Sequence, residues 1–388
     1  MTPSPQRLRI QIVLPFVDIT GGNLVLLELA NRLKQRGHDV WMLFDYPEVP
    51  WWKPRGFARM KLRDWGSCPW VDWFNLQVPV LRCPGLKDHQ VPEADAIIAS
   101  YWWHARQVAT LSKEKGRKFY YVQAYETDFL TGGMPLENWQ APVAGGERWM
   151  DPVACDLTYR LPMKHIVVAG WLGRLMWDRF HQPSVKITPP IDSASFPMPE
   201  EREFRNPPRC LMQHHTPSVK GVADGVQAFE LAAREMPGMT LSLFGPHSKE
   251  FATPHRTLGR ILPARLHEMY REHDIMIWPS HVEGYGLPPV EAMACQCAVA
   301  TTNNGGSEEF AFHERTALVS APKDPVALAA NIVRLAKDMA LRRRLAQAGC
   351  DWVRQHLTWE RACRSFECCC VDDSLWQGPN CEALSAKP

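Results

Sequence analysis

Short apolar runs alternate with amphipathic segments along most of the chain, and this alternation is the feature that most constrains its fold. RLRIQIVLPF (7–16) is typical of a buried strand, and the turn DITGGN (18–23) separates it from LVLLELANRLKQRG (24–37). In that segment Leu26, Leu29, Ala30 and Leu33 share one helical face. DVWMLF (39–44) is the next predicted strand. Strand, glycine turn, helix and strand form a βαβ unit, which predicts an α/β protein with parallel sheets.

The same alternation continues in two series, separated by VKITPPIDSASF (185–196), where two prolines favour a hinge. We therefore predict Rossmann-like domains at 1–190 and 191–358, and a disordered tail at 375–388 because that segment has few apolar residues. The further predicted strands are 94–100, 118–123, 165–170, 209–213, 240–245 and 274–280, and the further predicted helices are 171–180, 219–236, 262–272, 325–348 and 359–369.

Composition excludes several classes of protein. A formal charge of +2 excludes a strongly basic nucleic-acid binder on bulk charge, and no apolar run approaches the ~18 residues of a membrane-spanning helix. The first residues, MTPSPQRLRIQIVLPF, lack the pattern of a secretion signal, so we expect a cytoplasmic protein. The 12 cysteines then read as reduced thiols, and their spacing does not match a zinc site, so no metal is expected.

The segment PSHVEGYGLPPVE (279–291) has the pattern of a phosphate site. It joins a predicted strand to a helix, and the first N–H groups of a helix lack internal partners while its dipole adds roughly half a positive charge. Pro288 or Pro289 is tolerated there because the missing N–H would be unpaired anyway. Thr20-Gly21-Gly22-Asn23 forms a second loop of this kind.

Two glutamates flank the loop at 284–287. Glu291 lies about one turn inside the predicted helix, where its carboxylate could accept hydrogen bonds from ribose hydroxyls, and Glu283 could reach the other side of a ligand. Lys220 would add a positive charge against a diphosphate. Because a sugar nucleotide has a diphosphate between two sets of hydroxyls, the pattern indicates a nucleotide diphosphate sugar as ligand.

The stretch DIMIWPSHVEGYGLPPVEAMAC…TTNNGGSEE resembles the retaining glycosyltransferases of GT-B fold and family-4 type. The likeness rests on E-x7-E from Glu283 to Glu291, on G-x-G-L-P, on E-A-M-A, and on GG-x-x-E ending at Glu309. It implies two Rossmann-like domains facing a cleft, with a helix at 359–374 that crosses back to the first domain. It also implies a retaining hexosyl- or deoxyhexosyltransferase (EC 2.4) of surface polysaccharide synthesis, with a UDP, GDP or dTDP sugar as co-substrate, a glycan or lipid-linked acceptor, and no other cofactor.

The resemblance assigns roles to particular residues. Glu283 would contact the donor sugar as the catalytic residue, Glu291 would bind ribose, and Lys220 would bind diphosphate. His215 replaces a customary arginine, so either His215 donates a weaker hydrogen bond or another base, Arg209 or Arg174, substitutes. Gln296 replaces a customary glycine, so the preceding helix is expected to end differently. The donor-binding candidates are Lys220, His215, Gly284, Tyr285, Gly286, Leu287 and Glu291; the phosphate or acceptor loop is Gly21, Gly22 and Asn23; the acceptor candidates are Gln123, Tyr125 and Glu126.

Two other classes of protein stay open. A non-catalytic carbohydrate-binding protein on the same scaffold would use the tryptophan-rich segment 47–74 as a sugar platform, and the same segment suits a peripheral contact with the inner membrane. A nucleotide-sugar epimerase or oxidoreductase would use the first glycine turn, although TGGN does not match G-x-G-x-x-G.

Overall fold

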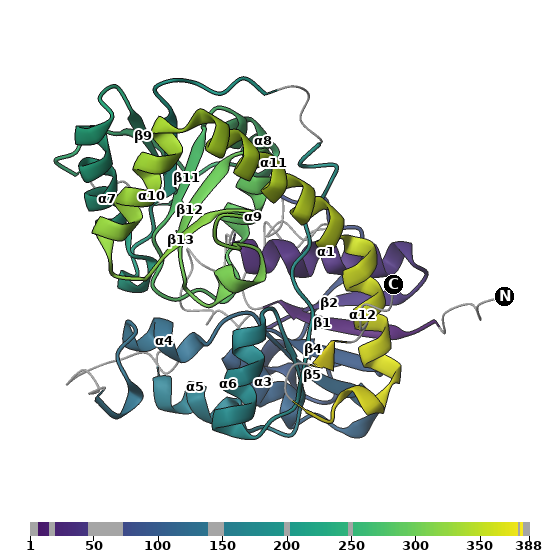
Figure 1. The fold of residues 1–388 in the computed structure, drawn as a ribbon. Helices are drawn as coiled ribbons and strands as arrows, with labels where there is room; N and C mark the ends of the chain where they lie inside the picture. The colour runs from purple at the N-terminus through teal and green to yellow at the C-terminus, as the bar shows by residue number, and fades with distance from the viewer. Residues whose placement is uncertain are drawn as a thin grey trace, which may run out of the picture.

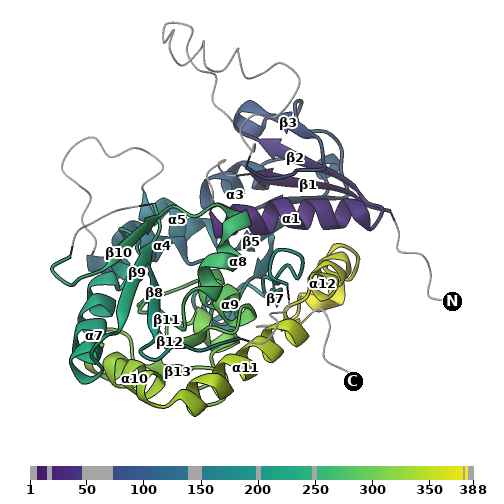
Figure 2. The same ribbon diagram turned by 90° about the horizontal axis from the view of Figure 1, so that it is seen from above.

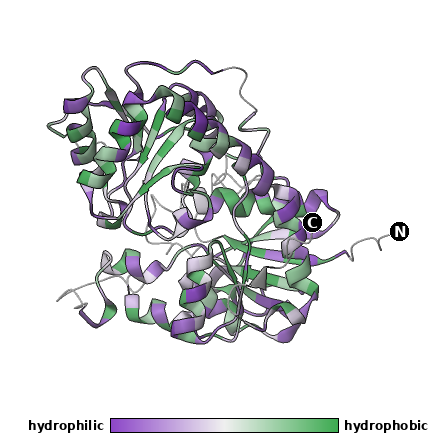
Figure 3. Ribbon diagram, viewed as in Figure 1, coloured by the Kyte–Doolittle hydropathy of each residue, from purple (hydrophilic) through white to green (hydrophobic). Residues whose placement is uncertain are grey.

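The computed structural model describes residues 7–14, 20–45, 73–138, 151–197, 202–246, 251–378 and 381–382. Apart from Trp73 and Phe74, the tryptophan-rich segment lies outside these residues. The chain forms two parallel-sheet α/β domains, one above the other in Figure 1. Hydrophobic residues are concentrated in the strands of both sheets, while the helices carry both kinds of residue (Figure 3).

The sheet of the first domain has eight parallel strands in the order β14-β7-β6-β5-β4-β1-β2-β3. The central strands β4 and β5 are buried apart from the first two residues of β5, because helices cover both faces, as parallel sheets require. The strands are β1 (Arg9–Leu14), β2 (Asp39–Phe44), β3 (Val80–Arg82), β4 (Ala96–Ala99), β5 (Arg117–Val122), β6 (Lys164–Val167), β7 (Ser184–Lys186) and β14 (Cys381–Glu382). The α-helices are α1 (Gly21–Gln35), α3 (Trp102–Ala109), α4 (Glu126–Thr131), α5 (Pro152–Thr158) and α6 (Gly170–Phe180).

The sheet of the second domain has six parallel strands in the order β10-β9-β8-β11-β12-β13. In both sheets the chain order reverses beside the first strand, which places a ligand crevice at the carboxyl ends of the strands. The strands are β8 (Arg209–Gln213), β9 (Thr240–Phe244), β10 (Arg256–Gly259), β11 (Ile275–Trp278), β12 (Ala298–Thr302) and β13 (Leu318–Ser320). The helices are α7 (Val222–Glu235), α8 (Pro263–Arg271), α9 (Leu287–Ala294), α10 (Pro325–Lys337) and α11 (Met339–His356), with short 3-10 turns η6 (Ser218–Lys220) and η7 (Gly306–Glu309).

Helix α12 (Trp359–Val371) leaves the second domain and packs against the first (Figures 1 and 2). Arg36 at the end of α1 bonds to Glu367 of α12 at 2.6 Å and to Glu360 at 2.6 Å, and the rings of Phe119 and Phe366 lie 6.2 Å apart. The predicted α/β fold, with two Rossmann-like domains and a returning helix, is confirmed. Within the described ranges, no helix combines the length and the hydropathy needed to cross a membrane.

Several predicted boundaries are wrong for local reasons. Helix α1 begins at Gly21 rather than after residue 23, because the Thr20 hydroxyl accepts a hydrogen bond from the Asn23 N–H at 3.2 Å and caps the helix. The predicted helix 325–348 is two helices, because Asp338 ends α10 and caps α11 through the Leu341 N–H at 2.9 Å. Within the expected disordered tail, residues 381–382 form β14, whose Cys381 pairs with Val185 of β7, and residues 379–380 and 383–388 lie outside the described part of the chain.

Helix α9 ends at the left-handed residue Gln296, whose φ is +55°. The Cys297 N–H donates to the Ala292 carbonyl at 2.8 Å, and the Gln296 N–H donates to the Met293 carbonyl at 2.9 Å. This is the hydrogen-bond pattern with which a glycine normally ends a helix. The expectation that the missing glycine changes the helix end is therefore wrong, because glutamine takes up the left-handed conformation instead.

Gln296→Gly is expected to stabilise the protein by about 0.5–1 kcal/mol, because glycine adopts the left-handed conformation without the steric cost that glutamine bears. The greater conformational entropy of glycine in the unfolded chain offsets only part of this gain. The measurement is the urea midpoint at constant slope. Gln347→Ala is the control, since the Gln296 amide donates to the Gln347 side chain at 2.6 Å and that bond is lost in both variants. A lower midpoint for Gln296→Gly than for Gln347→Ala would contradict the prediction.

Candidate functional site

A cavity of about 370 Å³ lies between the domains, at the carboxyl ends of strands from both sheets. The start of α1 and the loop after β5 line it from the first domain, and the loops after β8, β9 and β11 line it from the second. The structure brings most of the predicted site residues together at this cavity: Gly21, Gly22, Gln123, His215, Lys220, Glu283, Gly284, Tyr285, Gly286, Leu287 and Glu291.

Lys220 and Glu283 form an ion pair at the cavity. The Lys220 Nζ lies 2.9 and 2.8 Å from the two carboxylate oxygens of Glu283, and the Ser280 hydroxyl donates to the same carboxylate at 2.7 Å. Gly221 permits this approach, because a Cβ at that position would lie 2.1 Å from the Pro279 carbonyl oxygen. Glu283 is only 5 % exposed. The contacts with Lys220 and Ser280 hold its carboxylate in one position.

Glu291 lies on α9, and its side chain is buried at the edge of the same cavity. The Tyr270 hydroxyl donates to its carboxylate at 2.7 Å. Burial raises the pKa of Glu291 to about 7, and the hydrogen bond from Tyr270 lowers this pKa in part. Its protonation state therefore changes near neutral pH, and the ionised form is a strong acceptor for hydroxyl groups.

The start of α9 has fewer backbone hydrogen-bond donors than an ordinary helix start. Gly286, with φ of +99°, precedes the helix, and Leu287, Pro288 and Pro289 form its first turn. Proline has no N–H, so two of the positions that would normally offer a donor to an anion offer none. The dipole of the helix remains, but an anion bound here would depend for its hydrogen bonds more on side chains such as Lys220 than at an ordinary helix start.

Three predicted residues do not line the cavity. The Tyr125 hydroxyl donates to Asp156, and its ring packs 5.5 Å from that of Tyr159 inside the first domain. Glu126 accepts a hydrogen bond from the Trp102 N–H at the start of α3 at 2.9 Å, and its burial raises its pKa to about 8. Asn23 is buried in the first turn of α1. These positions give the three residues structural roles, and among the predicted acceptor contacts only Gln123 reaches the cavity.

The cationic side chains that share the cavity with Lys220 differ from those predicted from the sequence. Arg209 is on the exposed start of β8, and Arg174 pairs with Glu308 at 2.7 Å, outside this cavity. Arg260, which the sequence did not single out, lines the cavity, as His215 does. Its position follows from β10, a short edge strand with no clear apolar pattern, so no local signal pointed to Arg260.

Residues 198–352 match the family model described as glycosyl transferases group 1. This chain is similar to glycogen synthase of Mycobacterium tuberculosis (29 % identity over 181 residues, 44 % of each chain). It is also similar to D-inositol 3-phosphate glycosyltransferase of Salinispora tropica (32 % identity, 28 % of this chain and 21 % of that protein). The matched part therefore spans less than half the length of these curated relatives.

Solved structures extend the likeness to the whole fold. Sucrose-phosphate synthase from Thermosynechococcus elongatus superposes with a TM-score of 0.62 at 18 % identity, covering 92 % of this chain and 96 % of that one. Alr3699/HepE of Anabaena, in complex with UDP and glucose, superposes with a TM-score of 0.66 at 14 % identity, covering 93 % and 98 %. The fold is of the GT-B class. Within this fold, the segment that matches the glycosyl transferases group 1 model, residues 198–352, falls in the second domain.

Proposed function

We propose that the protein is a glycosyltransferase that moves a hexosyl or deoxyhexosyl group from a nucleotide diphosphate sugar to an acceptor, with retention at the anomeric carbon. One observation carries the proposal: Lys220, Glu283 and Glu291 meet at one interdomain cavity, and all three lie in the segment that matches the glycosyl transferases group 1 model. The complex of HepE with UDP and glucose supports a nucleotide sugar as donor.

The geometry suits the departure of a diphosphate. Lys220 and the dipole of α9 would stabilise the negative charge that develops on the leaving phosphate oxygen. Glu291 would hold the ribose hydroxyls, and Glu283 would contact the donor sugar. Because Glu283 is already bound by Lys220 and Ser280, it is poorly placed as a nucleophile. We therefore favour attack by the acceptor hydroxyl on the face that the diphosphate leaves, with the departing phosphate oxygen taking its proton.

The acceptor would be a glycan or a lipid-linked sugar of a surface polysaccharide. The curated relatives include a glycogen synthase and D-inositol 3-phosphate glycosyltransferases, so polyhydroxylated acceptors fit the proposal. Gln123 is the contact offered by the first domain. We also propose a cytoplasmic location with a peripheral contact at the inner membrane. Co-sedimentation with vesicles that contain anionic lipid tests the membrane contact.

The test is a thermal-shift panel of UDP, GDP and dTDP sugars, followed by transfer assays with the labelled donor that binds. Transfer with an unchanged anomeric configuration, read by NMR, is the expected result. Binding of glycans without transfer from any donor would favour the carbohydrate-binding alternative, and conversion of the free nucleotide sugar without an acceptor would favour the epimerase.

A further inference from the structure

Two loops of the second domain are joined to each other behind the ion pair. The Glu283 N–H donates to the Asn304 carbonyl at 2.9 Å, and Glu283 also pairs with Gly305 as an isolated parallel bridge. Residues 283–286 and 304–309 are therefore joined through Glu283, and they are called here the paired loops. Whatever holds the second loop also sets the position of Glu283.

The first turn of α6, in the other domain, holds the first of the paired loops. The Trp171 indole N–H donates to the Gly284 carbonyl at 3.1 Å. The same indole packs on Gly305, where an added Cβ would lie 3.0 Å from the ring. Gly284 also lies so close to the first domain that an added Cβ would lie 1.8 Å from the Gln123 carbonyl oxygen. One tryptophan thus contacts both paired loops, and only glycine fits where the domains meet.

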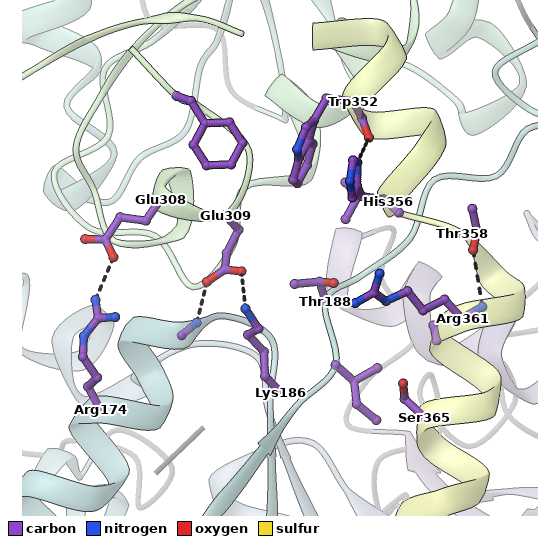
Figure 4. Close-up of a pocket in the computed structure, with 15 residues that line it drawn as sticks. Arg174, Lys186, Thr188, Glu308, Glu309, Trp352, His356, Thr358, Arg361 and Ser365 are labelled. Atoms are coloured by element: carbon purple, nitrogen blue, oxygen red, sulfur yellow. Dashed lines mark hydrogen bonds and ion pairs between the residues drawn. The ribbon is translucent and has the colours of Figure 1, made fainter. Parts of the chain in front are cut away.

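Glu309 holds the second of the paired loops to the same turn of α6 (Figure 4). One carboxylate oxygen accepts the Gly170 N–H at 2.6 Å, and the other lies 3.0 Å from the Lys186 Nζ. Glu308 pairs nearby with Arg174 at 2.7 Å, but that pair is much more exposed and contributes less. These contacts border a cavity of about 490 Å³ that α11 and α12 close on the opposite side.

We propose that Trp171 and Glu309 are positioning residues, which hold the paired loops so that Glu283 meets the donor sugar correctly for transfer. The inference rests on the proposed function and deepens it. The groups proposed to bind the nucleotide, Lys220 and Glu291, belong to the second domain, whereas the contacts of Trp171 and Glu309 cross between domains. Loss of these cross-domain contacts therefore lowers turnover and leaves nucleotide affinity nearly unchanged.

The first experiment compares Trp171→Phe with Trp177→Phe, whose indole on the same helix is 38 % exposed. Trp171→Phe keeps an aromatic ring but loses the hydrogen bond to Gly284, and kcat is expected to fall roughly 10-fold, because Glu283 is no longer held in the position that transfer needs. The Kd for the nucleoside diphosphate of the active donor should stay within about twofold. Trp177→Phe should keep the wild-type kcat. An unchanged kcat in Trp171→Phe, or a Kd weakened in proportion to kcat, would overturn the proposal.

A second pair of variants tests Glu309. Glu309→Ala removes both contacts, whereas Glu309→Gln keeps an oxygen that can accept the Gly170 N–H and loses only the ion pair with Lys186. The expected order of kcat is wild type, then Glu309→Gln, then Glu309→Ala, with Kd again nearly constant. Glu308→Ala is the matched control, since its carboxylate is on the same turn. An equal loss in Glu308→Ala would reject the role of Glu309.

Hydrogen–deuterium exchange separates this inference from the proposed function. Backbone amides of residues 283–287 are expected to exchange several-fold faster in Trp171→Phe and Glu309→Ala than in Trp177→Phe, whether or not a transfer reaction is found. Absence of transfer in the wild-type protein would refute the proposed function. Unchanged exchange at 283–287 would refute the positioning role on its own.

Discussion

Lys220→Ala is expected to weaken the binding of a nucleoside diphosphate about 100-fold, which corresponds to roughly 3 kcal/mol for a charge-assisted contact in a partly buried site. The effect is large because Pro288 and Pro289 remove N–H donors from the start of α9, so that the lysine supplies more of the contact with the anion. Isothermal titration calorimetry with UDP, GDP and dTDP measures it. Transfer should fall by at least the same factor, because the charge on the leaving diphosphate grows in the transition state.

The same substitution leaves Glu283 buried without its cation, so a loss of stability accompanies the loss of binding. Lys220→Met keeps the apolar stem and separates lost charge from lost packing. Lys337→Ala is the matched control, because Lys337 pairs with Glu235 at 2.7 Å on the surface, where such pairs contribute little. Unaltered diphosphate affinity in both Lys220 variants would reject the assignment of Lys220.

Glu291→Gln is expected to weaken nucleotide binding and to stabilise the free protein. The pKa of Glu291 is about 7 in the folded state against an ordinary value near 4.5. Between these values the folded protein binds more protons than the unfolded one, so the free energy of unfolding falls as pH rises. The loss is complete above about pH 7 and absent below about pH 4.5. Glutamine does not ionise, so the variant should be more stable than the wild type by roughly 2–3 kcal/mol at pH 8.

Binding shows the opposite effect of the same carboxylate. Above pH 7 the ionised Glu291 accepts hydrogen bonds from hydroxyls, so the wild-type affinity for the nucleotide should fall as pH drops below about 7. The affinity of Glu291→Gln should be about 10-fold lower than that of the wild type at pH 8 and should change little with pH. The Kd from pH 5.5 to 8.5 and urea unfolding at the same pH values measure both effects. Glu268→Gln, on the exposed face of α8, is the control. Equal pH profiles for Glu291→Gln and the wild type would show that Glu291 does not meet the nucleotide.

Local pattern was sufficient for the strands and helices that carry the site. The apolar runs at 209–213 and 274–280, and the prolines before Glu291, predicted β8, β11 and the start of α9 because periodicity and capping act over a few neighbouring residues. The short strands β3, β7, β10 and β13, all at sheet edges except β7, were missed because pairing with a neighbour, rather than their own composition, makes them strands. The break at Asp338 had a local signal, an aspartate at a capping position, that the long apolar stripe concealed.

The predicted acceptor contacts show where local reasoning ends. Gln123, Tyr125 and Glu126 follow one strand closely, yet only Gln123 lines the cavity. The Tyr125 side chain instead meets Asp156, which is contributed by α5, an element that the sequence did not predict. Adjacency in the sequence places side chains at the same end of a sheet, but it does not decide which of them turn inward.

The sequence by itself determined that the chain builds parallel α/β domains and that a glycine loop flanked by two acids opens a helix, because these features depend on spacing between near neighbours. Only the tertiary structure decided that Lys220 lies against Glu283, 63 positions away, and that Trp171 reaches across the domains to Gly284. Such distances are set by how strands and helices pack in three dimensions, and no periodicity in the chain encodes them.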